Sequence, residues 1–328
     1  MEDDLAAPQH YVADSVDLSE SYEPSLLEVE AAANQIRRYL QRRVTAVLSK
    51  FPTKPIIMLS GGIDSVLLAS VVAKQAPDVL AVTFVHSNSE SSRIELETAR
   101  AVAEELGLKH ILVDPNPQEA LELLREATRR LDTCDPWEVL AGVTLLACVR
   151  AADAEGYDGA IFTGAGADAL FLGGFNFSDD VDISGTWQQT VRAKVEKNFT
   201  RHRQIPDFYE RLLDDRGPDS ERHIQVWQTH QAFELAMSMA ASAVRGGDLQ
   251  TDKLVMREAA LRAGLPQNLV MNTKNPMQVS SGGIDMIVDA ARELLAGNGG
   301  HTAYTNPKTE SVDFIASRLM LELLHSQS

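Results

Sequence analysis

Short apolar segments alternate with helical patterns through the first half of the chain, and this alternation limits the possible folds. Four of the segments predict buried strands, at residues 56–59, 79–85, 110–113 and 159–162. Strands that alternate with helices are typical of a parallel, doubly wound sheet with helices on both faces. We therefore expect the α/β fold class.

The helical patterns lie before and between these strands. They cover residues 25–48, 66–74, 94–106, 121–131 and 137–152. Gly107 follows one of them and is suited to ending a helix. The first pattern carries a run of arginines, for which we expect a solvated helix face (Arg37, Arg38, Arg42 and Arg43).

The strand signals stop after Gly174, which suggests a division of the chain. We expect a flexible acidic N-terminus at residues 1–24, an α/β domain at residues 25–180 and a helical region at residues 181–328. Neither an internal repeat nor a low-complexity tract interrupts these parts.

The composition narrows the classes of partner. The chain has 47 acidic and 30 basic residues, a formal charge of −17, which repels nucleic-acid backbones and anionic membranes. We expect neither as a partner. The N-terminus has no basic and apolar leader, and no apolar run has transmembrane length, so we expect a cytoplasmic protein. The two cysteines, Cys134 and Cys148, are expected to be buried, reduced thiols.

A glycine-rich loop, Ser60–Ser65 (SGGIDS), stands between the first strand and an apolar helix. Two glycines let the backbone approach an anion, and the amides at the helix start would point at it. The negative charge of Asp64 alone would repel phosphate. Its presence in the loop is explained if it is a ligand of Mg²⁺ that bridges phosphate oxygens. The alternative is a tight turn with a capping side chain. The chain has no Walker A motif.

A second loop, Thr163–Gly174 (TGAGADALFLGG), follows the fourth strand. Its Gly164-x-Gly166-x-x-Ala169 spacing fits a dinucleotide fingerprint weakly, because that fingerprint belongs on the first strand–helix turn. Asp168 lies in this loop, and without further information it would be expected to cap a helix.

A third segment lies far along the chain, with Lys253 and Arg257 four residues apart, then Lys274, then Ser281-Gly282. Lys253 and Arg257 would share a helix face and contact pyrophosphate, or pair with Asp252 or Glu258. Lys274 by itself would be expected to lie in solvent, as most lone lysines do.

These three segments resemble a known family. SGGIDS is similar to the signature of the N-type ATP pyrophosphatases, and the second and third segments are similar to stretches of the asparagine synthetases and β-lactam synthetases. The resemblance covers about residues 25–295. It implies ATP and Mg²⁺ as cofactors, with Asp64 and Asp168 on the metal and Asp64, Asp168 and Lys274 as catalytic residues. The residues implied at the nucleotide are Leu59, Ser60, Gly61, Gly62, Asp64, Ser65, Thr83, Gly164 and Lys274.

The resemblance also implies a reaction. A small-molecule or peptide carboxylate would attack the α-phosphate of ATP, pyrophosphate would leave, and ammonia or an amine would displace AMP to give an amide. The 25–180 domain would bind ATP, and the C-terminal region would contribute Lys274. Ammonia would come from solution or from a separate amidotransferase or partner protein. A homo-oligomer is possible through the apolar C-terminal helix.

Two departures from the family pattern concern the nucleophile. The family's glutaminase domain begins with a catalytic cysteine at position two, where this chain has Glu2, so we expect no glutaminase activity of its own. Ala165 and Ala169 stand where the resemblance leads us to expect glutamates, and alanine transfers no proton. By position, Glu138, His86 and Tyr157 are candidates to replace the missing base.

Other functions stay open at this point. The chain could be a catalytically silent ATP-binding regulatory or scaffold protein of the same origin, which would bind ATP without forming AMP. It could also be another enzyme of the superfamily, such as an NAD synthetase-like amidating enzyme. A tRNA-thiolating enzyme is disfavoured by the negative charge and by the positions of the cysteines.

Overall fold

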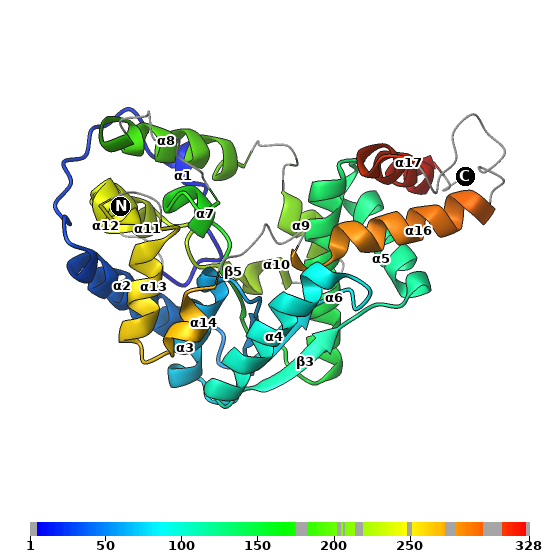
Figure 1. Cartoon of the computed structure of the whole chain (residues 1–328), viewed down its shortest axis with the longest axis horizontal. Coiled ribbons are helices and arrows are strands. Elements are labelled where there is room, and N and C mark those ends of the chain that lie inside the picture. The colour runs from blue at the N-terminus through cyan, green and yellow to red at the C-terminus, as the bar shows by residue number, and fades with distance from the viewer. Residues whose placement is uncertain are drawn as a thin grey trace.

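A computed structural model describes residues 5–174, 183–201, 205, 207–213, 219–247, 251–272, 280–297 and 310–325. A single five-stranded sheet lies at its centre, with helices on both sides (Figure 1). All neighbouring strands are parallel, in the order β3-β2-β1-β4-β5. The strands are β1 (Ile56–Met58), β2 (Leu80–Phe84), β3 (Lys109–Val113), β4 (Ile161–Thr163) and β5 (His223–Gln225). The predicted doubly wound α/β class is confirmed.

The fifth strand was not predicted. β5 pairs with β4 in parallel, and Thr163 aligns with Gln225. It has only three residues, and His223 and Gln225 flank its one apolar side chain, Ile224. Such a segment lacks an apolar run, so the interpretation that strands stop after Gly174 was wrong.

The sheet separates two apolar cores, because neighbouring residues of each strand point to opposite faces. Ile57 of β1 belongs to the first core and Ile56 to the second. The helices of the first core are α1 (Val12–Ser15), α2 (Val29–Lys50), α3 (Ile63–Gln75), α4 (Glu90–Glu105), α7 (Ala167–Leu170), α8 (Ile183–Asn198), α11 (His230–Met237), α12 (Ala241–Arg245), α13 (Leu254–Arg262) and α14 (Gln267–Val270).

The second core is covered by helices that lie to the right of the sheet in Figure 1. They are α5 (Pro117–Leu131), α6 (Pro136–Ala154), α9 (Phe208–Leu213), α16 (Gly283–Gly297) and α17 (Val312–His325). The short helix α10 (Asp219–Arg222) leads into β5. α17 packs on α16 and α5, so the apolar C-terminal helix buries its inner face within the chain.

Local sequence explains where the helices next to the site begin and end. Asn116 caps α5 through the amides of Gln118 and Glu119. Asp135 accepts from the Trp137 amide (2.8 Å) and Pro136 follows it, so α6 starts there. α4 ends before Gly107, whose φ of +66° is the left-handed conformation predicted for this glycine.

The described part of the N-terminus is packed on the body, although we expected a loose segment. Arg43 of α2 is fully buried, and its guanidinium donates to the carbonyls of Leu5 and Pro8. The Pro8 carbonyl also accepts from the Gln225 amide (3.1 Å), and Val12 lies in the first core. A buried charge must be hydrogen-bonded, so Arg43 belongs to this anchor and not to the solvated face we expected.

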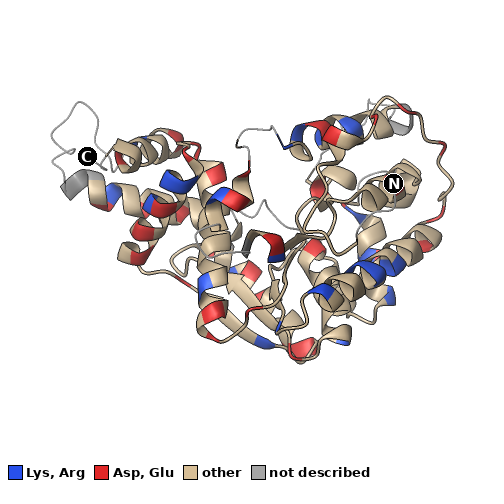
Figure 2. Cartoon of the chain, turned by 180° about the vertical axis from the view of Figure 1, so that it is seen from behind, with Lys and Arg blue, Asp and Glu red and all other residues tan. Residues whose placement is uncertain are grey.

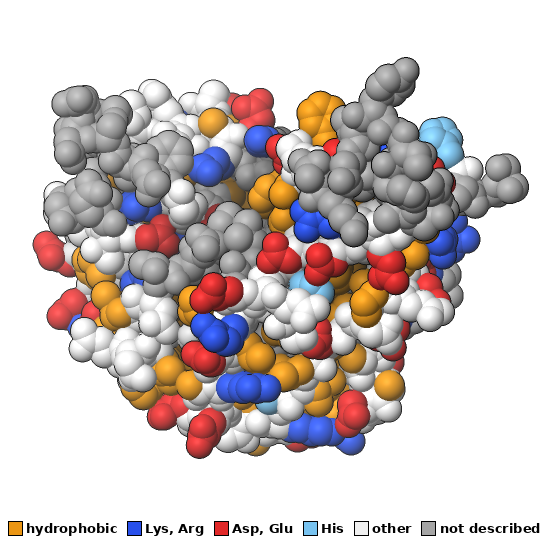
Figure 3. All heavy atoms as spheres, turned by 45° about the vertical axis from the view of Figure 1, so that its right-hand side comes forward, with side chains coloured by type: hydrophobic (Ala, Val, Ile, Leu, Met, Phe, Trp, Pro, Cys, Tyr) orange, Lys and Arg blue, Asp and Glu red, His pale blue; other side chains and the backbone are white. Residues whose placement is uncertain are grey.

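The surface carries acidic and basic residues on both halves of the molecule (Figure 2), and acidic side chains run across the middle of the face in Figure 3. Among the described helices, none is long and apolar enough to span a membrane.

Cys148 is buried in α6, and burial raises the pKa of its thiol to about 12. Cys134 is exposed in the α5–α6 connection, contrary to expectation.

His223 gives the fold a specific sensitivity to acid. The side chain is buried in β5, and burial lowers its pKa from 6.5 to about 3. As the pH falls below 6.5, the unfolded chain takes up this proton and the folded chain does not, so stability is lost. Between pH 7 and pH 4.5, the unfolding free energy of the wild type should fall by about 2 kcal/mol more than that of His223→Gln. Urea denaturation of both proteins at each pH checks this, and parallel pH profiles would contradict it.

Candidate active site

The two glycine-rich loops lie side by side at one edge of the sheet. SGGIDS follows β1 and Thr163–Gly174 follows β4, and these strands are adjacent, with Ile57 aligned to Phe162. From β1 the sheet continues through β2 and β3 on one side and through β4 and β5 on the other. The strand order therefore reverses here, and open α/β sheets bind ligands at such a crevice.

Ser65 closes the SGGIDS loop into a tight turn. Its hydroxyl donates to the Ser60 carbonyl (2.7 Å) and accepts from the Ser60 amide (3.1 Å). α3 begins at Ile63. The residue before it, Gly62, has no side chain that could cap the helix. The first amides of α3, a 13-residue helix, are thus placed to bind an anion with the help of the helix dipole.

Two glycines permit close approaches around this turn. A Cβ on Gly61 would lie 3.0 Å from the Glu95 carbonyl oxygen in α4. A Cβ on Gly164 would lie 2.9 Å from the Asp64 Cβ. Any larger residue at Gly164 would push the second loop away from the first, so this glycine brings the two aspartates together.

Lys253 joins the two aspartates. Its Nζ lies 2.7 and 2.6 Å from the two carboxylate oxygens of Asp64. The same Nζ lies 2.5 Å from Oδ1 of Asp168. The structure therefore brings together the two carboxylates that the sequence singled out, around one ammonium group.

The Lys253 side chain is only 5% exposed, whereas those of Asp64 and Asp168 are 22% and 71% exposed. Burial alone would lower the pKa of Lys253, but the charges of Asp64 and Asp168 outweigh burial and raise this pKa above its usual value. The ammonium form is therefore the one present at neutral pH. The Asp64 contact is the better shielded from solvent, and the Asp168 contact is more open to screening.

The exit of the second loop is fixed against the start of α13. A Cβ on Gly173 would lie 2.0 Å from Asp168 Oδ1 and 2.1 Å from Lys253 Cε, so the ion pair needs this glycine. Asp252 accepts from the Gly174 amide (3.1 Å) and from Arg245 (3.2 Å). These contacts hold Lys253 beside the loop.

The donor set at Lys253 fits Mg²⁺. Three carboxylate oxygens converge on one point within 2.5–2.7 Å of the Lys253 nitrogen, which is a cation position. Mg²⁺ is usually bound by one or two carboxylates together with water and substrate phosphates. In the described residues no group of three or more metal-binding side chains occurs.

The sequence did not predict this role of Lys253. We expected Lys253 and Arg257 to contact pyrophosphate or to pair with neighbours on their own helix. Arg257 does donate to the Asp252 carbonyl (2.7 Å), and Glu258 pairs with Arg262 (2.5 Å). Lys253 instead reaches Asp64, which lies 189 residues away in the sequence, so no local pattern could show the contact.

Leu59 and Thr83, which we expected at the nucleotide, are hydrogen-bonded to each other within the sheet. The Thr83 hydroxyl donates to the Leu59 carbonyl (2.6 Å) and lies 2.7 Å from His110 Nε2. Both Leu59 and Thr83 are buried. Burial lowers the pKa of His110, which favours its neutral form. These contacts fix the end of β1, from which the SGGIDS loop leaves.

Lys274 lies outside the described residues. The described residues that flank it are anchored near the SGGIDS loop. Asn272 Nδ2 lies 3.4 Å from the Thr98 hydroxyl of α4, the helix that also contacts Gly61. On the other side, the Ser281 carbonyl accepts from the His86 amide at the end of β2 (2.9 Å). Lys274 stays a prediction.

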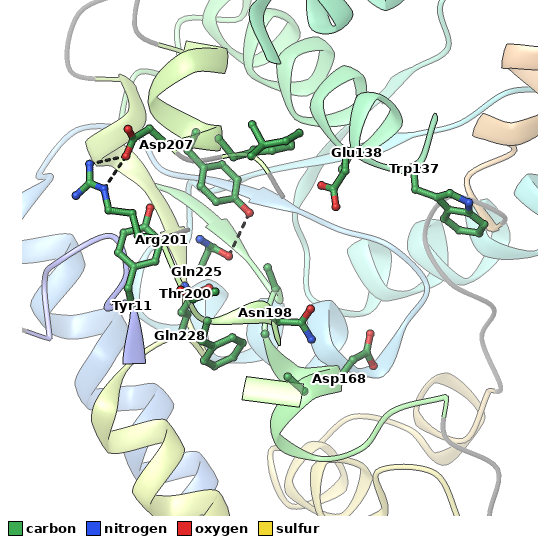
Figure 4. Close-up of a pocket in the computed structure, with 18 residues that line it drawn as sticks. Tyr11, Trp137, Glu138, Asp168, Asn198, Thr200, Arg201, Asp207, Gln225 and Gln228 are labelled. Atoms are coloured by element: carbon green, nitrogen blue, oxygen red, sulfur yellow. Dashed lines mark hydrogen bonds and ion pairs between the residues drawn. The ribbon is translucent and has the colours of Figure 1, made fainter. Parts of the chain in front are cut away.

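A cavity of about 530 Å³ opens beside the second loop (Figure 4). Ala165, Gly166, Asp168 and Ala169 form one wall, and Glu138 of α6 lines another. The carboxylates of Glu138 and Asp168 point into the same space from above and below in this view. The loop in which two expected glutamates are alanines thus faces a glutamate from a different helix.

The other two candidates for the missing base lie elsewhere. Tyr157 is at the amino ends of the strands, where the Nζ atoms of Lys54 and Lys109 lie 5.4 and 5.3 Å from its ring. His86 follows β2 at the correct edge, and its Nε2 lies 3.4 Å from Asp289. Neither is among the described residues that line the cavity. Of the three, only Glu138 lines the same cavity as Ala165.

Comparisons with known proteins agree with this geometry. The family model for asparagine synthase matches residues 35–235, more than half of the chain and including both loops. The glutamine-hydrolyzing asparagine synthetase of Homo sapiens is 30% identical over 152 residues, which are 44% of this chain and 26% of that protein. Asparagine synthetase 2 of Lotus japonicus is 28% identical over 123 residues, 36% of this chain and 21% of that protein.

A shorter match is to the 7-cyano-7-deazaguanine synthase of Methanosphaera stadtmanae, 39% identical over 61 residues, 19% of this chain and 26% of that protein. The matches to these three relatives cover about a quarter of their lengths. The fold and the paired loops at the carboxyl edge of the sheet define an α/β protein with a parallel, doubly wound sheet. The chain belongs to the asparagine synthase family.

Gly173 tests the ion-pair cluster through stability. Gly173→Ala places a methyl group against Asp168 and Lys253, and should lower the unfolding free energy by about 1–3 kcal/mol. Gly247→Ala is the matched control, because an added Cβ there meets nothing within 4 Å. Urea denaturation measures both. Equal stability of the two variants would show that the cluster does not need the space at Gly173.

Proposed function

We propose that this protein is an ATP-dependent, AMP-forming carbon–nitrogen ligase that adenylates a carboxylate and transfers the acyl group to ammonia or an amine. The observation that carries the proposal is the Asp64–Lys253–Asp168 cluster beside the SGGIDS loop. It combines an anion-binding turn with two carboxylates that converge on one cation, as a Mg²⁺-triphosphate requires.

In this proposal the SGGIDS loop binds the pyrophosphate part of ATP through the first amides of α3 and the Ser60 hydroxyl. Asp64 and Asp168 hold Mg²⁺, which supplies charge neutralisation for the leaving pyrophosphate. The substrate carboxylate then attacks the α-phosphate, which gives an acyl-adenylate and pyrophosphate. In this proposal Lys274 supplies a further positive charge at the reacting phosphate.

Lys253 has a distinct role before ATP arrives. Asp64 and Asp168 would repel each other at this separation if they were alone. The Lys253 ammonium holds them together, and it contacts the same oxygens that would bind the metal. Asp64 and Asp168 would therefore hold either the Lys253 ammonium or Mg²⁺. With Mg²⁺ on the two carboxylates, the Lys253 charge would be available to the phosphates.

A second function is favoured by one observation, the alanines at positions 165 and 169. A protein that has lost the residues expected to handle the nucleophile could bind ATP for regulation without forming AMP. The two functions differ in one product: the ligase releases AMP and pyrophosphate with a suitable carboxylate, and the silent protein does not.

Asp64→Asn tests the proposed ligase. The protein would be incubated with ATP, Mg²⁺, ammonium and a pool of carboxylates, and AMP and pyrophosphate would be measured. Asp64→Asn should lower their formation by at least about a hundredfold, because it removes a metal carboxylate. Asp78→Asn, which makes the same change at an exposed residue after α3, should keep the full rate.

Full AMP formation by Asp64→Asn would overturn the proposed mechanism. ATP binding by the wild-type protein with no AMP from any carboxylate would favour the silent ATP-binding function. Dividing the pool identifies the substrate when AMP is formed.

A further inference from the structure

We propose that the cavity beside the second loop binds the nucleophile, that this nucleophile is an organic amine with an aromatic or apolar body, and that Glu138 holds it and accepts its proton. This inference rests on the proposed ligase function and specifies its second half-reaction. Four observations on the cavity support it: its place, its charge, its lining and the way α6 presents Glu138.

The place of the cavity fits the nucleophile. Its wall is formed by Ala165, Gly166, Asp168 and Ala169, and Asp168 also contacts Lys253 at the candidate phosphate site. A molecule in the cavity would therefore lie next to an acyl group activated at that site. The methyl groups of Ala165 and Ala169 accept no proton, and Glu138 supplies a carboxylate from the other side of the cavity.

The charge of the cavity fits an ammonium group. The one cationic side chain in its described lining, Arg201, is bound to Asp207, with Nε and one terminal nitrogen 2.7 and 2.5 Å from the same oxygen. Glu138 and Asp168 are the other carboxylic acids of the described lining, and Asp168 is already paired with Lys253. Burial and the charge of Glu210 raise the pKa of Tyr11, whose hydroxyl therefore stays protonated.

The lining is larger and more aromatic than ammonia requires. Five aromatic side chains face the cavity: Tyr11, Trp137, Phe199, Phe208 and Tyr209. A molecule the size of ammonia or water occupies about 30 Å³ in a liquid, and this cavity has about 530 Å³. Aromatic rings bind flat apolar groups and also attract cations over their faces. An amine on an aromatic or apolar body uses both properties, whereas a second carboxylate would be repelled by Glu138 and Asp168.

Glu138 is presented from a well-defined helix start. It lies in the first turn of α6, which Asp135 caps through the Trp137 amide (2.8 Å) and Pro136 opens. The next residues, Val139 and Leu140, are buried in the second core. The backbone of Glu138 is therefore fixed by the helix start, and its carboxylate points into the cavity (Figure 4).

The chemical step balances without a further reactant. The ammonium form of the amine gives one proton to Glu138 and becomes the nucleophile. Its nitrogen lone pair forms the C–N bond at the acyl carbon, and the bond from that carbon to the phosphate oxygen breaks with its electrons leaving on AMP. The nitrogen then loses a second proton to water, and the products are an amide and AMP.

Direct binding tests the inference without knowledge of the carboxylate. Calorimetric titration of the full chain with tryptamine, phenethylamine and tyramine should show saturable binding of at least one of them. Indole-3-acetate, which has the body of tryptamine with the opposite charge, should bind at least about tenfold more weakly. Glu138→Gln should weaken amine binding by at least about tenfold, and Glu138→Asp, which keeps the charge, by less.

Glu122→Gln removes the same charge from an exposed position on α5 and should bind amines like the wild type. Absence of binding by all three amines, equal binding of indole-3-acetate, or unchanged binding by Glu138→Gln would each overturn the inference. These results are independent of AMP formation. Amine binding without AMP formation would contradict the ligase function. AMP formation without amine binding would contradict only the role of Glu138 and the cavity.

Discussion

The contact of one buried ammonium with two carboxylates ties the parts of this structure together. Lys253 comes from the start of α13, Asp64 from the loop after β1 and Asp168 from the loop after β4. An ammonium that is 5% exposed needs such partners, and the two acids need a cation between them. The cluster therefore holds the start of α13 against the carboxyl edge of the sheet.

The close packing of Asp64, Asp168 and Lys253 also requires glycines around the cluster. Gly164 lets the second loop approach Asp64, and Gly173 leaves room for the Asp168–Lys253 contact. Asp252 and Arg245 then fix the loop exit. A site of this kind is assembled from three distant segments, and each glycine serves a defined close approach. The neighbouring cavity takes one wall from the same loop, so the ion-pair cluster and the cavity share Asp168.

Much of the fold could be predicted because apolar runs such as Ile56–Leu59 are local signals of buried strands. The SGGIDS loop and Asp168 could also be singled out from the sequence, because the residues that form each loop are consecutive in the chain. β5 was missed because His223 and Gln225 make it polar in sequence, and its pairing with β4 depends on the tertiary fold. Arg43 and Lys253 were misread because their partners are 35 or more residues away. The position of Glu138 beside Ala165 likewise required the packing of α6 on the sheet.

The central claim is that Asp64 and Asp168 act together on one metal ion at the nucleotide, in competition with Lys253. The most direct test is the affinity for α,β-methylene-ATP with and without Mg²⁺, in the wild type, Asp64→Asn and Asp168→Asn. We predict that Mg²⁺ tightens binding to the wild type by at least about tenfold and that each substitution removes most of this gain. A Mg²⁺ effect that survives in both variants would contradict the account.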